Sequence, residues 1–168
     1  MPGEEADNGA NGEETVTIDK PGLRHVTDLA IDVEAPLVVG RSGFGVRRTV
    51  AFAGGVASGP VLSGRVLPGV DYQLIRADGT IELHARYVIE TEDGARVYVE
   101  NTGLRSGAPE ALARLNRGEP VEPSEIYFRA APRFETGAAK LEWLMSRLFI
   151  ATGVRRSARV ELSVYEIL

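Results

Sequence analysis

The chain has 168 residues, which is enough for one domain with a hydrophobic core and too few for two ordinary domains. It contains no cysteine, which excludes a disulfide framework, and it has 19 basic residues against 24 acidic ones. The net charge of −5 lacks the basic excess of a nucleic-acid-binding protein, so we expect no nucleic-acid partner.

The first twenty residues differ in composition from the rest of the chain. They hold six acidic residues and one lysine, so the net charge belongs to this segment and the remaining residues are balanced. Almost nothing large and apolar precedes Val16, and such a composition buries too little surface to order a chain. We therefore predict a disordered acidic tail over 1–20 and a single domain over 21–168.

The start of the chain is acidic and polar, unlike the basic and then apolar start of a secretory signal. No stretch approaches the ~18 consecutive apolar residues that a membrane-spanning helix needs. These features predict a cytoplasmic protein without a membrane partner.

Short runs of alternating apolar and polar residues recur after residue 20, with glycine and proline between them. One short helix is predicted at 109–118, because Pro109 suits the first helical position and Gly118 suits the end. About nine strands at such spacing are typical of an all-β sandwich or barrel. The expected strands are 26–33, 46–52, 60–67, 71–77, 80–91, 95–101, 126–131, 141–150 and 159–167.

Two Asp-Gly pairs, at 78–79 and 93–94, lie between strand-like runs and are the strongest turn signals in the chain. If both are two-residue turns, the register counted outward from each turn places Asp71 opposite Arg86, and Arg86 opposite Asn101. The three side chains then form one row on one face of the sheet, since alternation fixes the face once the register is fixed. This row of an acid, a guanidinium and an amide is the leading candidate site.

The same register divides the hairpin strands into an apolar face, with Leu83 and Tyr87, and a polar face that carries the row. In one interpretation the apolar face fills the barrel and the polar face meets water, and the pattern alone favours this arrangement. In the other, the polar face lines a cavity that encloses one small ligand. The outward apolar rows would then need cover, for which a homodimer is one arrangement.

Several motifs resemble those of one known family. They are similar to motifs of the uncharacterised family called domain of unknown function 3237, a group of UPF0311-like proteins, and the resemblance covers nearly all of the chain after the tail. It implies an all-β fold, a single antiparallel β-barrel of lipocalin-like or calycin-like shape with about eight to ten strands and one short helix. The motifs are the string from Gly64 to Tyr72, Asp78-Gly79-Thr80, Ala85-Arg86-Tyr87, Asp93-Gly94, the string from Pro123 to Arg129, Phe134-Glu135, Trp143-Leu144, and Gly153 with Arg155.

The family motifs carry over to Asp71, Arg86, Tyr127 and Arg129, which are our predicted catalytic residues. Tyr127 and Arg129 alternate with Phe128 and so share one strand face. We further predict that a ligand contacts Tyr98, Asn101, His84 and Trp143.

Two positions depart from the family pattern. Tyr72 stands where a tryptophan is usual, and Met145 stands where an asparagine is usual. These departures place the identity of the substrate in doubt.

Two functions fit the predicted residues. One is a cofactor-free lyase, isomerase or cyclase that acts on an oxygenated or aromatic small molecule in the barrel interior, with Asp71 as base and arginines stabilising negative charge. The other is a non-catalytic binding protein for a small carboxylate or phenol. No cofactor is expected. No metal site is expected either, because the chain offers two histidines and no cysteine as ligands.

The predicted pair of Asp71 and Arg86 carries an expectation for stability. If both side chains lie in contact inside the barrel, replacing Arg86 by alanine leaves a buried carboxylate without its partner. Such a loss is strongly destabilising.

Overall fold

The computed structural model describes residues 18–168, so the predicted disordered tail falls mostly outside the described residues. Within this range the chain forms ten strands, one α-helix and two short 3-10 helices. They are β1 (Leu23–Val33), β2 (Leu37–Ser42), β3 (Gly45–Ser58), β4 (Gly64–Val66), β5 (Gly69–Ile75), β6 (Ile81–Thr91), β7 (Arg96–Gly107), α1 (Pro109–Asn116), η1 (Pro123–Glu125), β8 (Ile126–Thr136), η2 (Ala139–Ser146), β9 (Phe149–Arg155) and β10 (Arg159–Ile167).

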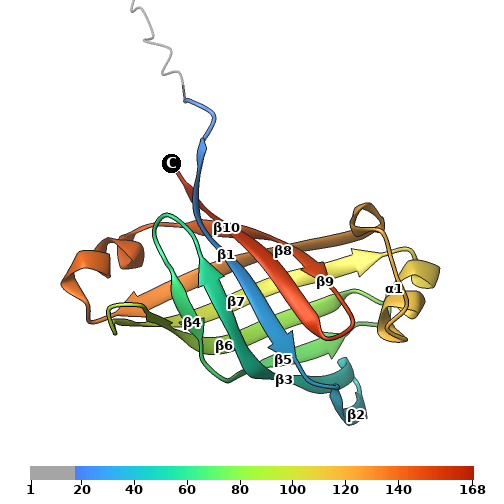
Figure 1. Ribbon diagram of the computed structural model, residues 1–168. Helices are drawn as coiled ribbons and strands as arrows, with labels where there is room; N and C mark the ends of the chain where they lie inside the picture. Colours follow the sequence, from blue (N-terminus) through green and yellow to red (C-terminus); the bar gives the residue numbers. More distant parts are fainter. Residues whose placement is uncertain (1–17) are drawn as a thin grey trace, which may run out of the picture.

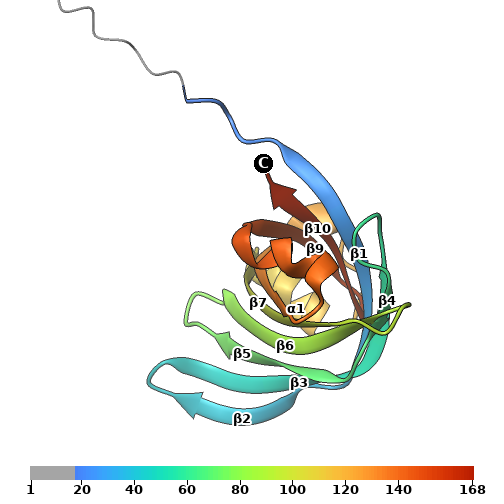
Figure 2. The same ribbon diagram turned by 90° about the vertical axis from the view of Figure 1, so that its left-hand side faces the viewer.

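Eight of these strands close into an antiparallel barrel (Figure 1). Around the barrel the order is β1, β10, β9, β8, β7, β6, β5 and β3, and β3 pairs again with β1. There are two further strands. The short strand β4 pairs with β3 and β6, the same two strands between which β5 lies, and β2 pairs with β3 alone. Figure 2 shows β2 along the outer side of β3, away from the barrel interior. The predicted barrel of eight to ten strands with one helix is confirmed.

The barrel interior holds the hydrophobic core. Inward side chains of neighbouring strands, such as Ile89, Val97 and Val99, are fully buried. The helical segments lie at opposite ends of the barrel: η2 places Leu141 and Leu144 in the core at one end, and α1 lies at the other (Figure 1). One end is therefore closed by apolar side chains.

Both Asp-Gly hairpins turn through three residues instead of two. The Arg76 N–H donates to the carbonyl of Thr80, which leaves 77–79 in the loop, and the Thr91 N–H donates to the carbonyl of Ala95, which leaves 92–94. Positive φ occurs only at the glycine of each loop, 83° at one and 84° at the other, whereas a two-residue type I′ turn also needs it at the aspartate. The predicted register is therefore wrong by one residue in both hairpins.

This shift changes which side chains face inward. Asp71 lies opposite Ala85, and Ala85 lies opposite Asn101, whereas Arg86 lies opposite Glu100. Because side chains alternate between faces, a slip of one residue moves Arg86 to the outer face. Asp71 and Asn101 still share one face, since the same error occurs in both hairpins and cancels across three strands.

The predicted strand at 141–150 is also wrong over 141–148, since β9 begins at Phe149. Residues Ala139–Ser146 form η2, because Leu141 and Leu144 recur at a spacing of three, which matches a 3-10 helix and not a strand. The prediction omitted β2, whose consecutive apolar residues at 37–39 are all exposed and show no alternation.

The positive φ of Gly94, in the turn between β6 and β7, can be tested by substitution. A Cβ on this residue would have nothing within 4 Å, so a change to alanine adds only the strain of a positive φ. We expect Gly94→Ala to lower the free energy of unfolding by about 1 kcal/mol. Gly43→Ala is the control, since Gly43 is equally open and lacks a positive φ. Equal effects of the two substitutions on chemical denaturation would contradict this turn geometry.

Candidate functional site

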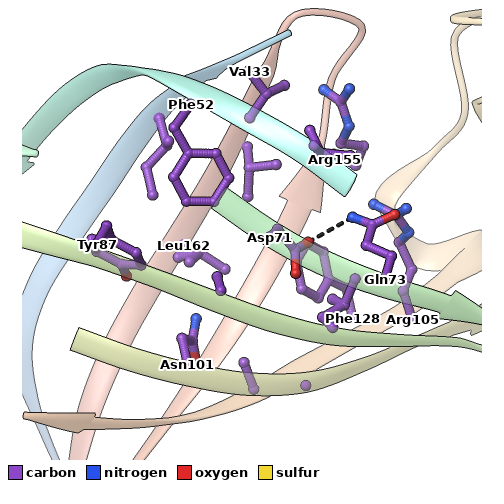
Figure 3. Close-up of a pocket in the computed structure, with 17 residues that line it drawn as sticks. Val33, Phe52, Asp71, Gln73, Tyr87, Asn101, Arg105, Phe128, Arg155 and Leu162 are labelled. Atoms are coloured by element: carbon purple, nitrogen blue, oxygen red, sulfur yellow. Dashed lines mark hydrogen bonds between the residues drawn. The ribbon is translucent and has the colours of Figure 1, made fainter. Parts of the chain in front are cut away.

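The closed barrel leaves a cavity of about 40 Å³ in its interior. Most of its wall is apolar and includes the rings of Phe52 and Phe128 (Figure 3). Six polar side chains interrupt this wall, and they come from four strands. They are Asp71 and Gln73 of β5, Tyr87 of β6, Asn101 and Arg105 of β7, and Arg155 of β9.

A chain of hydrogen bonds fixes Asp71 on the cavity wall. The Arg48 Nε–H donates to Gln73 Oε1 (2.8 Å), and Gln73 Nε2 donates to Asp71 Oδ2 (2.6 Å; Figure 3). The backbone N–H of His84 donates to Asp71 Oδ1 (2.9 Å). Each carboxylate oxygen therefore accepts one hydrogen bond from the protein.

Burial raises the pKa of the Asp71 carboxyl above its usual value. The hydrogen bonds from Gln73 and from the His84 N–H, and the charges of Arg105 and Arg48, act in the opposite direction without cancelling the effect of burial. A carboxylate in such surroundings is a stronger base than an exposed one.

Three buried polar atoms on the same cavity wall have no hydrogen-bond partner among residues 18–168. They are Tyr87 Oη, Asn101 Oδ1 and Arg105 Nε, on side chains that are 3%, 6% and 3% exposed. Burial raises the pKa of Tyr87, and the nearby charge of Asp71 acts in the same direction, so the phenol stays protonated at neutral pH. Since buried polar groups are nearly always paired, the three atoms mark positions along this cavity wall where a hydrogen-bond partner belongs.

The cavity continues into a wider space of about 370 Å³ at the α1 end of the barrel. Both spaces are lined by Gln73, Arg105 and Arg155, together with Val33 and Val50. The outer part is bounded by the end of α1, by the β1–β2 connection at 34–36 and by the turn between β9 and β10. We call this outer space the vestibule, and it offers a path from the surface to the interior cavity.

Among the predicted site residues, Asp71 and Asn101 lie on the cavity wall. Arg86, which was predicted to lie between them, does not. The side chain of Arg86 is 54% exposed on the outer face, where it donates to Glu100 Oε1 (3.1 Å). The predicted contact between Asp71 and Arg86 is therefore wrong, for the reason of register given above.

Tyr127 and Arg129 share one face of β8, as their alternation predicts, but this is the outer face because Phe128 and Ala130 fill the interior. The Arg129 guanidinium lies 5.2 Å from the centre of the Tyr127 ring. Together with His84 they line a shallow hollow on the outside of the barrel. The barrel wall separates them from Asp71, so they cannot act on the same bound molecule as this carboxylate.

The two remaining predicted ligand contacts also lie away from the cavity. Tyr98 faces outward from β7. Trp143 lies on η2 at the closed end of the barrel, half-buried against the core, with the Arg24 guanidinium 5.2 Å from its ring centre. Its surroundings are those of a packing residue.

Four residues at the cavity or the vestibule escaped the sequence analysis. Tyr87 was assigned to the apolar face that the structure places inside, and Arg105 was missed because the strand was expected to end at Asn101. Continuing the alternation of β7 through Gly103 would have found Arg105. Nothing in the local sequence distinguishes Arg48 or Gln73 from exposed polar residues.

Within residues 18–168 no three His, Cys, Asp or Glu side chains converge as metal ligands. In the same range, no helix is long and apolar enough to cross a bilayer.

The fold and the cavity define a small antiparallel β-barrel with polar groups in its interior. The chain belongs to the family described as "Protein of unknown function (DUF3237)", whose model matches residues 21–167, and the predicted family is confirmed. A UPF0311 protein of Rhodopseudomonas palustris is 51% identical over 130 residues, which make up 77% of this chain and 85% of that protein.

Solved structures show the same barrel. A conserved protein of unknown function from Rhodopseudomonas palustris matches with a TM-score of 0.87 at 44% identity, over 90% of this chain and 100% of that one. A beta-barrel like protein from Acinetobacter baumannii matches with a TM-score of 0.76 at 30% identity, over 90% of this chain and 100% of that one.

A more distant likeness leads to the fungus Penicillium herquei. Its hydroalkoxylation enzyme phnH is 37% identical over 54 residues, which make up 32% of this chain and 36% of that protein. The crystal structure of an enzyme from the same fungus matches with a TM-score of 0.69 at 21% identity, over 91% of this chain and 98% of that one, which shows a shared fold.

The raised pKa of Asp71 predicts how stability depends on pH. The folded protein binds a proton at Asp71 more tightly than the unfolded chain does, so this contribution to stability is present below the usual carboxyl pKa and is lost as pH rises through the folded pKa. We expect the melting temperature of the wild type to fall relative to that of Asp71→Asn as the pH rises above the usual carboxyl pKa of about 4.

Asp93→Asn is the control for this measurement. A hydrogen bond from Lys140 lowers the pKa of Asp93 to about 2, so its contribution does not change above the usual carboxyl pKa. The difference from wild type should stay constant over the same range. A constant difference for Asp71→Asn as well would contradict the raised pKa.

The exposure of Arg86 reverses the expectation drawn from the sequence. We expect Arg86→Ala to leave the melting temperature almost unchanged, because an exposed ion pair contributes little. Arg24→Ala is the contrasting variant, since its partner Glu166 is 2% exposed and would keep only the longer ion pair with Arg147 (3.6 Å). A loss at Arg86 as large as that at Arg24 would show that Arg86 is not where the structure places it.

Proposed function

We propose that the barrel interior binds a small oxygenated molecule and that Asp71 moves a proton on it, as a cofactor-free lyase, isomerase or cyclase. One observation carries this proposal: the three buried polar atoms without a partner all lie on the wall of one cavity. Leaving a buried polar group unpaired costs about 1–3 kcal/mol, and a bound molecule with matching oxygen and hydroxyl groups would remove this cost.

The roles follow from the chemistry of each group. Asp71, whose pKa is raised by burial, accepts a proton from the bound molecule as general base. The Tyr87 phenol, which stays protonated, stabilises the negative charge that develops on an oxygen of the substrate. The proton that Asp71 accepts then returns to another atom of the same molecule, so no oxidant or reductant is needed.

The distant likeness to a hydroalkoxylation enzyme supports the same reaction class. Hydroalkoxylation adds the O–H of an alcohol across a carbon–carbon double bond, which moves one proton from oxygen to carbon. A reaction of this kind needs a base and an acid held on either side of the substrate. Asp71 and Tyr87, on the walls of one cavity, offer such a pair.

The second candidate function is binding without turnover of a small carboxylate or phenol. The hydrogen bonds of Asp71 favour it, since both carboxylate oxygens already accept a hydrogen bond from Gln73 or His84. In this function Asp71 only holds Gln73 and its neighbours in place.

A thermal-shift screen with phenols, carboxylates and enolisable ketones tests the proposal, because a ligand that binds only the folded state raises the melting temperature. We expect a compound that stabilises the wild type to bind Tyr87→Phe about tenfold more weakly, through the loss of one buried hydrogen bond. Tyr98→Phe is the matched control, since Tyr98 lies on the outer face of the neighbouring strand. Equal affinities of the two variants would place the compound outside the barrel and contradict the proposal.

Asp71→Asn distinguishes the two candidate functions for any compound so identified. Turnover by the wild type that disappears in Asp71→Asn, with binding retained, supports the enzyme. Binding by both proteins without turnover by either supports the binding protein.

A further inference from the structure

Positive charge is concentrated where the interior cavity meets the vestibule. Arg105 and Arg155 line both spaces, and Arg48 lines the vestibule. Figure 3 shows Arg105 and Arg155 at the end of the cavity where Gln73 lies, with Tyr87 at the opposite end. The carboxylates that line the two spaces are Asp71 in the interior cavity and Glu34 in the vestibule, so the three arginines outnumber them.

None of these three arginines forms an ion pair with a carboxylate within residues 18–168, although most arginines on the outer surface do. Arg48 donates its Nε–H to the neutral amide of Gln73, and Arg155 donates to the backbone carbonyls of Arg156 and Arg159. The Nε of Arg105, on a side chain that is 3% exposed, has no hydrogen-bond partner among the described residues. The cluster is therefore short of negative charge.

The arginines also disfavour one another. Burial lowers the pKa of Arg105 to about 10; the charges of Arg48 and Arg155 act in the same direction, and the charge of Asp71 opposes them without cancelling their effect. Like charges held together away from water lower stability, and protein interiors gain when such groups are replaced by neutral ones. An anion placed among the three guanidinium groups would reverse both effects.

We propose that Arg48, Arg105 and Arg155 form an anion subsite for the carboxylate of the molecule that the barrel binds. This inference rests on the proposed function and adds a substrate class to it: a small organic acid whose apolar part lies against Phe52 and Phe128 and whose further oxygen group faces Tyr87 and Asn101. The planar guanidinium groups match a carboxylate, and the Phe52 and Phe128 rings match an apolar or aromatic body. The Arg105 guanidinium carbon lies 5.8 Å from the centre of the Phe128 ring, which holds the cation beside the apolar wall.

The vestibule determines how such an acid enters. Its wall is formed by the end of α1 at 115–118, the β1–β2 connection and Ser157, so the acid passes Arg155 and Arg48 before it reaches Arg105. The carboxylate stays at the junction, and the rest of the molecule, with its further oxygen group, is directed inward to Asp71 and Tyr87.

Matched pairs of an acid and its neutral amide test this subsite: benzoate with benzamide, and acetate with acetamide. At constant ionic strength we expect the wild-type protein to bind the carboxylate of at least one pair about tenfold or more tightly than its amide, measured by calorimetry. We expect Arg155→Gln to remove this preference and Arg86→Gln, on the outer face, to keep it. Arg48→Gln is a second variant, in case Arg155→Gln does not fold.

The melting temperature of the ligand-free variants gives an independent readout. A subsite that is unfavourable without its anion predicts that Arg155→Gln melts no lower than the wild type, whereas a purely structural arginine would lower the melting temperature when removed. Carboxylates that bind no better than their amides, or a preference that survives in both Arg155→Gln and Arg48→Gln, would overturn the inference.

The outcomes separate this inference from the proposed function. If amides bind as well as acids and Tyr87→Phe weakens both, the interior binds a ligand but the arginines do not select an anion. If no compound of either charge binds in the interior, the proposed function fails and the anion subsite fails with it.

Discussion

The register of two hairpins decides the chemistry of this barrel. Each turn contains three residues, with one glycine at positive φ. The length of the turn sets which residues of β5, β6 and β7 lie opposite each other. With a two-residue turn, Arg86 would face the interior beside Asp71. With the observed turns, Ala85 lies between Asp71 and Asn101 and leaves space there, while Arg86 pairs with Glu100 in solvent. The interior cavity depends on this arrangement.

The interior combines a close-packed core with polar groups that the fold alone does not need. At the η2 end, apolar side chains such as Leu144 and Val97 fill the barrel. Toward the α1 end, Asp71 and Gln73 are held by hydrogen bonds, and three polar atoms along the cavity wall have no hydrogen-bond partner among residues 18–168. A core filled with apolar residues would be more stable than this one. Such an arrangement is typical of a binding or active site, where local stability is lost for the sake of a ligand.

The sequence was sufficient to predict the family, the barrel and α1, because these depend on alternation, turn residues and motifs spread along the chain. It placed Asp71 and Asn101 on one face correctly even though the register was shifted. It failed at Arg86, because an Asp-Gly pair marks a turn without giving its length. It failed at Arg105 because Gly103 suggested a strand end, whereas its missing Cβ makes room for Ala130 of β8, only 2.9 Å from where that atom would lie. Tyr127 and Arg129 share a face as expected, but only closure of the barrel decides that this face is outside.

The most direct test of an interior site is the NMR signal of the Arg105 Nε–H, assigned by its loss in Arg105→Lys and followed during addition of benzoate. This N–H is the buried donor that has no partner within the described chain. We expect its signal to shift as benzoate binds, while the ring signals of Tyr127 on the outer surface stay unchanged. An Arg105 signal that does not move, or ring signals of Tyr127 that move in its place, would contradict the account of this barrel as a container for a small molecule.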